Sequence, residues 1–280
     1  MELVFIGTGG GRVNLIKQFR GTGGFRINGS LTFHIDPGPG ALVHSVKLGQ
    51  DTTKIDVLVV SHYHIDHCSD SAVLCEAMTN YGFKKQGILI GSKNSIEGDE
   101  KGDKALSAYH LGLPAKRITA LPGKTIEEEY KGVKFKMEFF QMKHDEKTSF
   151  GFKLHMDGKV IGYISDTEYF EGLGKNFAGC DVLVVNNLKP MHDGIPDHLA
   201  SEDTIKILKA AKPKLCVLNH LGMKFFRVPA EVDAQRISEE SGVKTIAPKD
   251  GMIISVDEGK VNERKGKKDA ELKNLSDFYE

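Results

Sequence analysis

The sequence has few cysteines, no net charge and no long apolar run. Its 280 residues include four cysteines, none in a CxxC pair. This argues against a disulfide framework and predicts reduced, buried thiols in a cytoplasmic protein. The 38 basic and 38 acidic residues cancel, so no global field attracts nucleic acid or a membrane, although a local patch stays open. Because no window of 18 apolar residues and no basic leader occur, we expect neither a membrane span nor a signal peptide.

What remains is the composition of an ordinary soluble globular protein, with 40% hydrophobic and 27% charged residues. No internal repeat, low-complexity tract or interdomain linker interrupts the chain. Strand-like and helical patterns alternate in two successive halves. We therefore expect one α/β domain over residues 1–256, followed by a charged C-terminal tail over residues 257–280.

A histidine-rich turn within residues 55–68 is the most informative stretch. Ile55 to Val60 is an apolar, β-branched run that predicts a buried strand, and a helix is expected over residues 69–80. The turn between them carries four side chains that can bind metal, namely His62, His64, Asp66 and His67.

The spacing of these four side chains allows two ions. Residues two apart in an extended segment point the same way, so His62 and His64 can hold one ion together. Where the chain turns into the helix, Asp66 and His67 can reach a second ion. Neutral imidazole and carboxylate are ligands that suit zinc and its neighbours.

Further candidates stand at the ends of predicted elements. Four of them follow predicted strands, namely Asp36, His144, Asp166 and His220, and His198 precedes a helix expected over residues 201–211. Taken alone, such an aspartate can stabilise its own turn or cap a helix, and such a histidine can be structural. His34 and His44 match no motif, and we expect structural or surface roles for both.

A glycine-rich loop over residues 7–12 follows the first predicted strand. A dinucleotide-binding GxGxxG fingerprint would need glycine where Arg12 stands, and no helical pattern follows immediately. We therefore reject that interpretation. Two alternatives stay open, a flexible loop that approaches a substrate closely and a simple turn.

The run His62-Tyr63-His64-Ile65-Asp66-His67 resembles the HxHxDH signature of the metallo-β-lactamase superfamily. That resemblance covers about residues 1–256. It implies an α/β fold, a four-layer αββα sandwich in which helices flank two mixed β-sheets. The Gly7-Thr8-Gly9 loop is similar to the first loop of the ribonuclease Z-like branch. The order His198, helix, strand, His220 is also similar to that of the ribonuclease Z-like branch.

The resemblance also implies a site for two divalent metal ions, expected to be zinc, with manganese or iron as alternatives. The implied ligands are His62, His64 and His144 for one ion, Asp66, His67 and His220 for the other, and Asp166 as the bridge. Asp36 is implied to orient the metal-binding loop from behind. The expected catalytic residues are Asp66 and His198.

For the reaction we expect a phosphodiesterase that uses a metal-bridging hydroxide, because an uncoordinated histidine beside the ions can protonate a leaving alkoxide. A small phosphodiester or a short nucleic acid fits best. A tRNA-processing nuclease is an alternative, but only 22 residues separate His144 from Asp166 and no basic, glycine-rich arm occurs. An acyl hydrolase of glyoxalase II type and a non-enzymatic binding module also stay open, as does the oligomeric state, a homodimer included.

Overall fold

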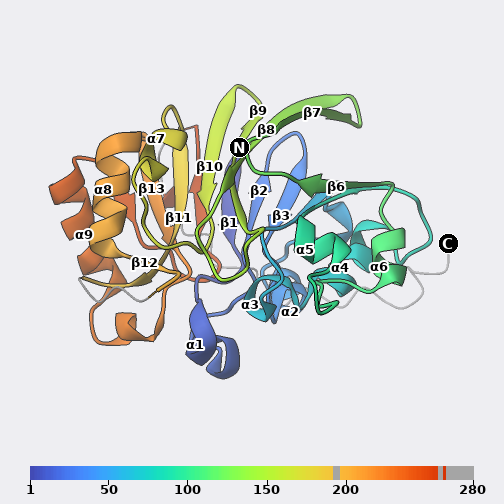
Figure 1. Cartoon of the computed structure of the whole chain (residues 1–280), viewed down its shortest axis with the longest axis horizontal. Coiled ribbons are helices and arrows are strands. Elements are labelled where there is room, and N and C mark those ends of the chain that lie inside the picture. Colours follow the sequence, from blue (N-terminus) through green and yellow to red (C-terminus); the bar gives the residue numbers. More distant parts are fainter. Residues whose placement is uncertain (192–195, 258–260, 263–280) are drawn as a thin grey trace.

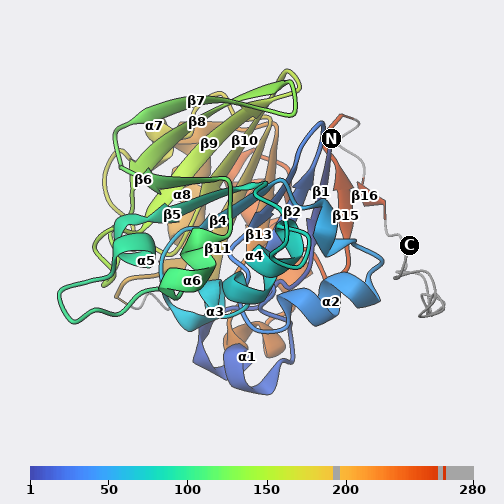
Figure 2. The same ribbon diagram turned by 90° about the vertical axis from the view of Figure 1, so that its right-hand side faces the viewer.

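The protein is described here by a computed structural model that covers residues 1–191, 196–257 and 261–262. Two β-sheets lie face to face, and helices cover their outer faces, as Figure 1 shows. Figure 2 shows the helices of the N-terminal half beside the first sheet. Within the described residues, no helix has both the length and the apolar character needed to cross a membrane.

The first sheet has the strand order β16-β15-β1-β2-β3-β4-β5-β6. Strands β3 to β6 run parallel, whereas β1 pairs antiparallel with both β2 and β15. The bounds are β1 Glu2–Phe5, β2 Phe25–Asn28, β3 Thr32–Ile35, β4 Val57–Val60, β5 Ile88–Ser92, β6 Lys116–Ala120, β15 Ile253–Ser255 and β16 Val261–Asn262.

The second sheet has the strand order β14-β13-β11-β10-β9-β8-β7, and β12 pairs with β11. It is mixed as well, because β10, β11 and β13 are parallel and β7 to β10 form antiparallel pairs. The bounds are β7 Thr125–Tyr130, β8 Val133–Gln141, β9 Phe150–Met156, β10 Lys159–Ile164, β11 Val182–Lys189, β12 Leu199–Ala200, β13 Leu215–Asn219 and β14 Thr245–Ile246.

Short helices connect the strands and form the outer layers. In the first half these are α1 Gly11–Lys17, α2 Ala41–Lys47, η1 Thr52–Lys54, α3 Ile65–Cys68, α4 Ser71–Met78, α5 Lys93–Glu97 and α6 Ala108–Gly112. The second half contributes α7 Leu173–Asn176, α8 Ser201–Ala211, η2 Met223–Phe226 and α9 Ala230–Ser241. The helix predicted at 201–211 is confirmed.

The inner faces of the two sheets share one apolar core. Phe33 of β3 meets Phe135 of β8 edge to face, with ring centroids 5.3 Å apart. Phe25 of β2 meets Tyr163 of β10 at the same centroid distance. Alternate residues on both strands of each pair point into this core, which is what fixes the register of the sandwich. The expected α/β fold with two mixed sheets flanked by helices is therefore confirmed.

Near both ends of the chain the structure has elements that the sequence patterns do not predict. The statement that no helix follows the glycine loop is wrong, because α1 begins at Gly11. Pattern reading missed it because its apolar residues do not face the core. The predicted tail at 257–280 lies mostly outside the described residues, but β16 within it pairs with β15 and extends the first sheet beyond residue 256.

Candidate metal centre

The candidate site residues meet at one edge of the sandwich, where parallel strands of both sheets end. In the first sheet, Asp36 follows β3 and His62 lies two residues beyond β4. In the second sheet, Asp166 lies two residues beyond β10 and His220 directly follows β13. The carboxyl ends of parallel strands share an edge, so residues far apart in sequence converge there.

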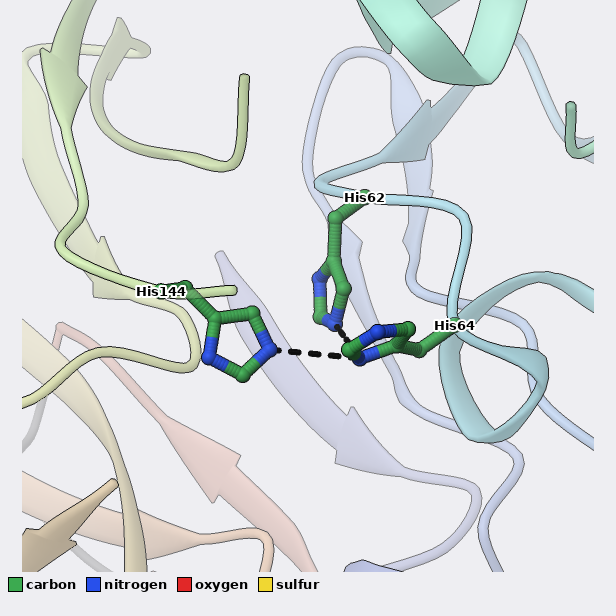
Figure 3. Close-up of side chains that lie close together, drawn as sticks. All are labelled: His62, His64 and His144. Carbon is green, nitrogen blue, oxygen red and sulfur yellow. Dashed lines mark hydrogen bonds between the residues drawn. The ribbon is translucent and has the colours of Figure 1, made fainter. Parts of the chain in front are cut away.

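Three histidines form a first cluster, drawn in Figure 3. The Nδ1 atom of His64 lies 3.2 Å from Nε2 of His62 and 3.2 Å from Nε2 of His144. His62 and His144 are buried, whereas the His64 side chain is 34% exposed. The sequence placed His144 some 80 residues away from this pair, and the structure brings the three rings together.

A second cluster joins Asp66, His67 and His220. The Nε2 atoms of His67 and His220 are 3.1 Å apart, and Oδ2 of Asp66 lies 3.3 Å from Nε2 of His220. Asp66 and His67 belong to α3 and group with His220, although the ring centroids of His67 and His62 also lie only 4.1 Å apart. The two pairs of the HxHxDH motif therefore face two different clusters, as the spacing predicts.

Asp166 lies between the clusters. Its Oδ2 atom is 3.3 Å from Nε2 of His67, of His220 and of His198. Asp166 also forms a close group with His62 and His67, in which the potential ligand atoms lie within 4.8 Å of one another. A single carboxylate oxygen thus faces the imidazole nitrogens of three histidines.

The outer hydrogen bonds of the histidines favour metal binding. His67 donates from Nδ1 to Asp36 at 3.0 Å, and His144 donates from Nδ1 to the carbonyl of Asp197 at 3.0 Å. His62 Nδ1 lies 3.0 Å from the Ser61 hydroxyl. Each bond turns the other ring nitrogen toward the cluster, which is the orientation of metal-binding histidines. Converging imidazole nitrogens and carboxylates fit divalent cations.

Asp36 lies behind the metal-binding loop and accepts several hydrogen bonds. Its two oxygens accept hydrogen bonds from the Ser61 backbone at 2.7 Å, the Ser61 hydroxyl at 2.6 Å and the Tyr163 hydroxyl at 2.6 Å. Together with His67, four donors converge on this one buried carboxylate. Asp36 therefore lies behind the ring of His67, and the role that the resemblance implies for it, orienting the metal-binding loop, stays a prediction.

Sequence analysis missed Asn186 and Tyr163. Asn186 donates from Nδ2 to Oδ1 of Asp166 at 2.7 Å and lies 3.0 Å from the Tyr163 hydroxyl, which in turn donates to Asp36. Asn186 therefore occupies Oδ1 of Asp166 and leaves Oδ2 to the histidines. The available signal was two consecutive asparagines within an otherwise apolar strand, since a buried amide needs a polar partner.

The glycine loop supports the second cluster. A side chain at Gly10 would place its Cβ 2.1 Å from Cγ of His220, so only glycine fits against that ring. The backbone N–H of Gly11 donates to Oδ2 of Asp66 at 3.1 Å. The loop therefore closely approaches side chains of the site, and its expected approach to a substrate stays a prediction. His220 itself has a φ of 56°, a strained value for histidine.

Burial and charge set the protonation of the clusters. Burial and the neighbouring His67 hold the pKa of His62 well below its usual value, which keeps that ring neutral. His67 is different, because Asp166 and Asp66 outweigh burial and raise its pKa well above the usual value. Despite burial, His220 and His67 hold the pKa of Asp166 well below its usual range. Without a cation, a proton therefore balances these carboxylates.

His198 reaches the clusters from the loop before β12. Its Nδ1 lies 3.2 Å from the carbonyl of Pro196 and its Nε2 lies 3.3 Å from Asp166 Oδ2. Both ring nitrogens thus face acceptors, which favours the doubly protonated ring. Burial lowers the pKa of His198, but the Asp166 carboxylate outweighs this effect and raises it.

The histidines without a motif lie elsewhere. His34 is fully buried, where its Nδ1 accepts a hydrogen bond from Arg26 and its Nε2 lies 2.9 Å from the Gly23 carbonyl. His44 lies on α2, beside Gly21 and Gly40. The four cysteines are buried and free, as expected from their spacing.

Comparison with known proteins identifies the family. Residues 32–221 match the beta-lactamase superfamily domain. A protein from Methanocaldococcus jannaschii is 33% identical over 263 residues, which cover 93% of this chain and 97% of the relative.

Solved structures share the fold at lower identity. The metallo-β-lactamase fold protein YhfI from Bacillus subtilis has a TM-score of 0.71 at 19% identity, covering 90% of this chain and 98% of its own. Human short-form tRNase Z has a TM-score of 0.64 at 17% identity, covering 91% and 99%. A diphosphatase of the PhnP family has a TM-score of 0.64 at 16% identity, covering 91% and 97%. By its sequence match, its fold and its histidine motif, this chain belongs to the beta-lactamase superfamily of metal-dependent hydrolases.

Proposed function

We propose that this chain is a dinuclear metal-dependent phosphodiesterase of the ribonuclease Z-like branch. The proposed ligands are His62, His64 and His144 for one ion, Asp66, His67 and His220 for the other, and Asp166 between them. The donor set of imidazoles and carboxylates favours zinc, with manganese or iron as alternatives. The four buried free thiols support a reducing, cytoplasmic location.

Divalent ions bound at such a site lower the pKa of water toward neutrality and withdraw charge from a scissile bond. The chain itself supplies orientation. Asp36 fixes the ring of His67, and Asn186 fixes the carboxylate of Asp166 so that one oxygen, Oδ2, faces the histidines. Such supporting partners hold ligands in place before substrate binds.

The observation that carries the substrate class is the position of His198. It faces Asp166 at 3.3 Å from outside both motif clusters, and both of its nitrogens face acceptors. When a substrate binds, the Nε2–H of a protonated His198 can turn from Asp166 to a non-bridging phosphate oxygen, while Nδ1–H stays on the Pro196 carbonyl. As the bond from phosphorus to the leaving oxygen breaks, His198 can pass its proton to that oxygen, while water supplies the hydroxyl that stays on phosphorus. An acyl substrate has less need of such a group.

The compared structures support the same substrate class, because two of them are named as a tRNase Z and a diphosphatase. The short connection between His144 and Asp166 argues against a tRNA substrate, because it leaves no room for a basic, glycine-rich arm. We therefore favour a small phosphodiester or a short nucleic acid.

The test pairs metal analysis with hydrolysis of bis(p-nitrophenyl) phosphate in wild type and His198→Ala. Two zinc ions per chain in both proteins, with a rate at least about 100-fold lower in the variant, is the expected result. His110→Ala is the matched control, because His110 lies on α6 and is hydrogen-bonded to Ser107, the residue that precedes this helix. Loss of zinc in His198→Ala would make this histidine a ligand. Turnover of thioesters without turnover of phosphodiesters would replace the proposal with an acyl hydrolase.

A further inference from the structure

Helix α1 has its apolar side chains on the outside. Asn14 is its buried residue, whereas Ile16 is 72% exposed and Phe19, two residues beyond the helix, is 64% exposed. A surface helix normally buries its apolar face. The helix projects from the lower edge of the molecule in both views (Figures 1 and 2). Apolar side chains gathered on such a projection mark a binding surface.

An aromatic pair extends this surface to η2. The rings of Phe19 and Phe226 meet edge to face, with centroids 5.3 Å apart and planes at 76°. Phe226 is 53% exposed although it has this partner. Two aromatic rings held against each other at the surface offer a platform for a flat ligand.

The same two segments are basic in a chain of zero net charge. Residues 11–20 and 223–228 contain five arginines and lysines and no aspartate or glutamate. Of these, Arg12 and Lys17 on α1 and Arg227 after η2 are exposed. The two segments that carry the aromatic pair are therefore locally basic, although the whole chain has no net charge.

This surface is fixed to the candidate metal centre. Asn14 donates from Nδ2 to the carbonyl of Leu221 at 2.7 Å, and Leu221 directly follows His220. At the start of α1, the N–H of Gly11 donates to Asp66. Helix α1 is thus held in a fixed position relative to the second cluster.

We propose that these residues form a basic–aromatic strip for single-stranded nucleic acid, made of Arg12, Ile16, Lys17, Phe19, Phe226 and Arg227. Bases stack on the two phenylalanines, and flanking phosphates pair with the three cations. The proposal deepens the phosphodiesterase function proposed above and rests on it, because the strip binds the chain that flanks the scissile bond. A second copy is a poorer occupant, since a symmetric contact would set the same cations against each other.

The experiment measures binding of a fluorescein-labelled octathymidylate with phosphorothioate linkages, which resist hydrolysis, to the zinc-loaded full chain. Phe19→Ala and Phe226→Ala should each weaken binding at least about fivefold. The triple variant Arg12→Gln, Lys17→Gln, Arg227→Gln should reduce the slope of log affinity against log salt by about 2, because three phosphate contacts are lost.

Phe83→Ala is the matched control, since Phe83 is 85% exposed and lies outside both segments. Its affinity should equal that of wild type. Zinc content and melting temperature verify that each variant is folded. Wild-type affinity in both phenylalanine variants would overturn the strip, even if bis(p-nitrophenyl) phosphate is hydrolysed.

Two further outcomes separate the strip from the proposed activity. If the wild-type chain hydrolyses no phosphodiester while the strip variants still bind the oligonucleotide more weakly than wild type, that result would support the strip and contradict the proposed phosphodiesterase activity. A dimer in sedimentation that Phe19→Ala converts to monomer, with unchanged oligonucleotide affinity, would assign the surface to a second copy and overturn the proposal.

Discussion

Nδ1 of His67 lies 3.0 Å from Oδ2 of Asp36, so the outer proton of this imidazole is held by a carboxylate that also accepts three other hydrogen bonds. In Asp36→Asn an amide N–H must face some of these donors. We therefore expect the ring of His67 to lose its orientation and zinc affinity to fall about 10- to 100-fold.

Competition with a chelator of known affinity measures this loss. Asp157→Asn is the matched control, because Asp157 also accepts a backbone hydrogen bond, from Ser30, at an exposed position. Equal zinc affinity in Asp36→Asn and wild type would show that the carboxylate does not support the metal centre.

Gly10 offers a second test of the centre. Its backbone is extended, with a φ of −148°, so alanine is acceptable to the main chain and only the contact with His220 opposes it. We expect Gly10→Ala to displace His220, to reduce zinc from two ions to one per chain and to lower the free energy of unfolding by about 1–3 kcal/mol. Metal analysis and urea unfolding measure both effects.

Gly112→Ala is the control for this substitution, because nothing lies within 4 Å of a Cβ built there. It should keep both ions. Two firmly bound ions in Gly10→Ala would mean that His220 can move aside without leaving the ligand set.

The sequence indicates the candidate metal ligands better than the residues that hydrogen-bond to those ligands. His62, Asp166 and His220 each stand just beyond an apolar strand, a pattern visible without coordinates. In the structure β4 of the first sheet lies between the parallel strands β3 and β5, and β10 and β13 of the second sheet each pair in parallel with β11. Asn186 lies within a strand, and its contact with Asp166 depends on which strands become adjacent, which local pattern does not encode. Hydrophobic periodicity marks the strands and helices along the chain. It therefore indicates both the fold class and the positions at which strands end.

Helix α1 shows why the other part of the prediction failed. Its apolar residues form no stripe toward the core, because Val13 and Ile16 face solvent while Asn14 is buried against Leu221. Reading of hydrophobic periodicity assumes that apolar residues face the core. Where a helix instead exposes its apolar residues, hydrophobic periodicity does not reveal the helix.

Removal of metal should couple to uptake of protons. Without a cation, Asp166 and Asp66 raise the pKa of His67 well above its usual value, so zinc must displace a proton from this cluster. We expect zinc affinity to rise with pH through neutrality and zinc binding to release protons. Calorimetry in two buffers of different ionisation enthalpy measures the release. A binding enthalpy independent of the buffer would contradict the prediction.

His34 predicts how stability depends on pH. Burial first, and then the charge of Arg26, lower the pKa of His34 to about 3, whereas a histidine in the unfolded chain has a pKa of about 6.5. Below pH 6.5 the unfolded chain binds the extra proton, so this contribution to stability is complete above pH 6.5 and is lost as pH falls toward 3. One proton corresponds to about 1.4 kcal/mol per pH unit. Between pH 6.5 and 4.5, His34→Gln should therefore lose about 2 kcal/mol less than wild type. Urea unfolding of both proteins with chelator present, so that metal release does not contribute, measures the difference, and parallel pH curves would contradict it.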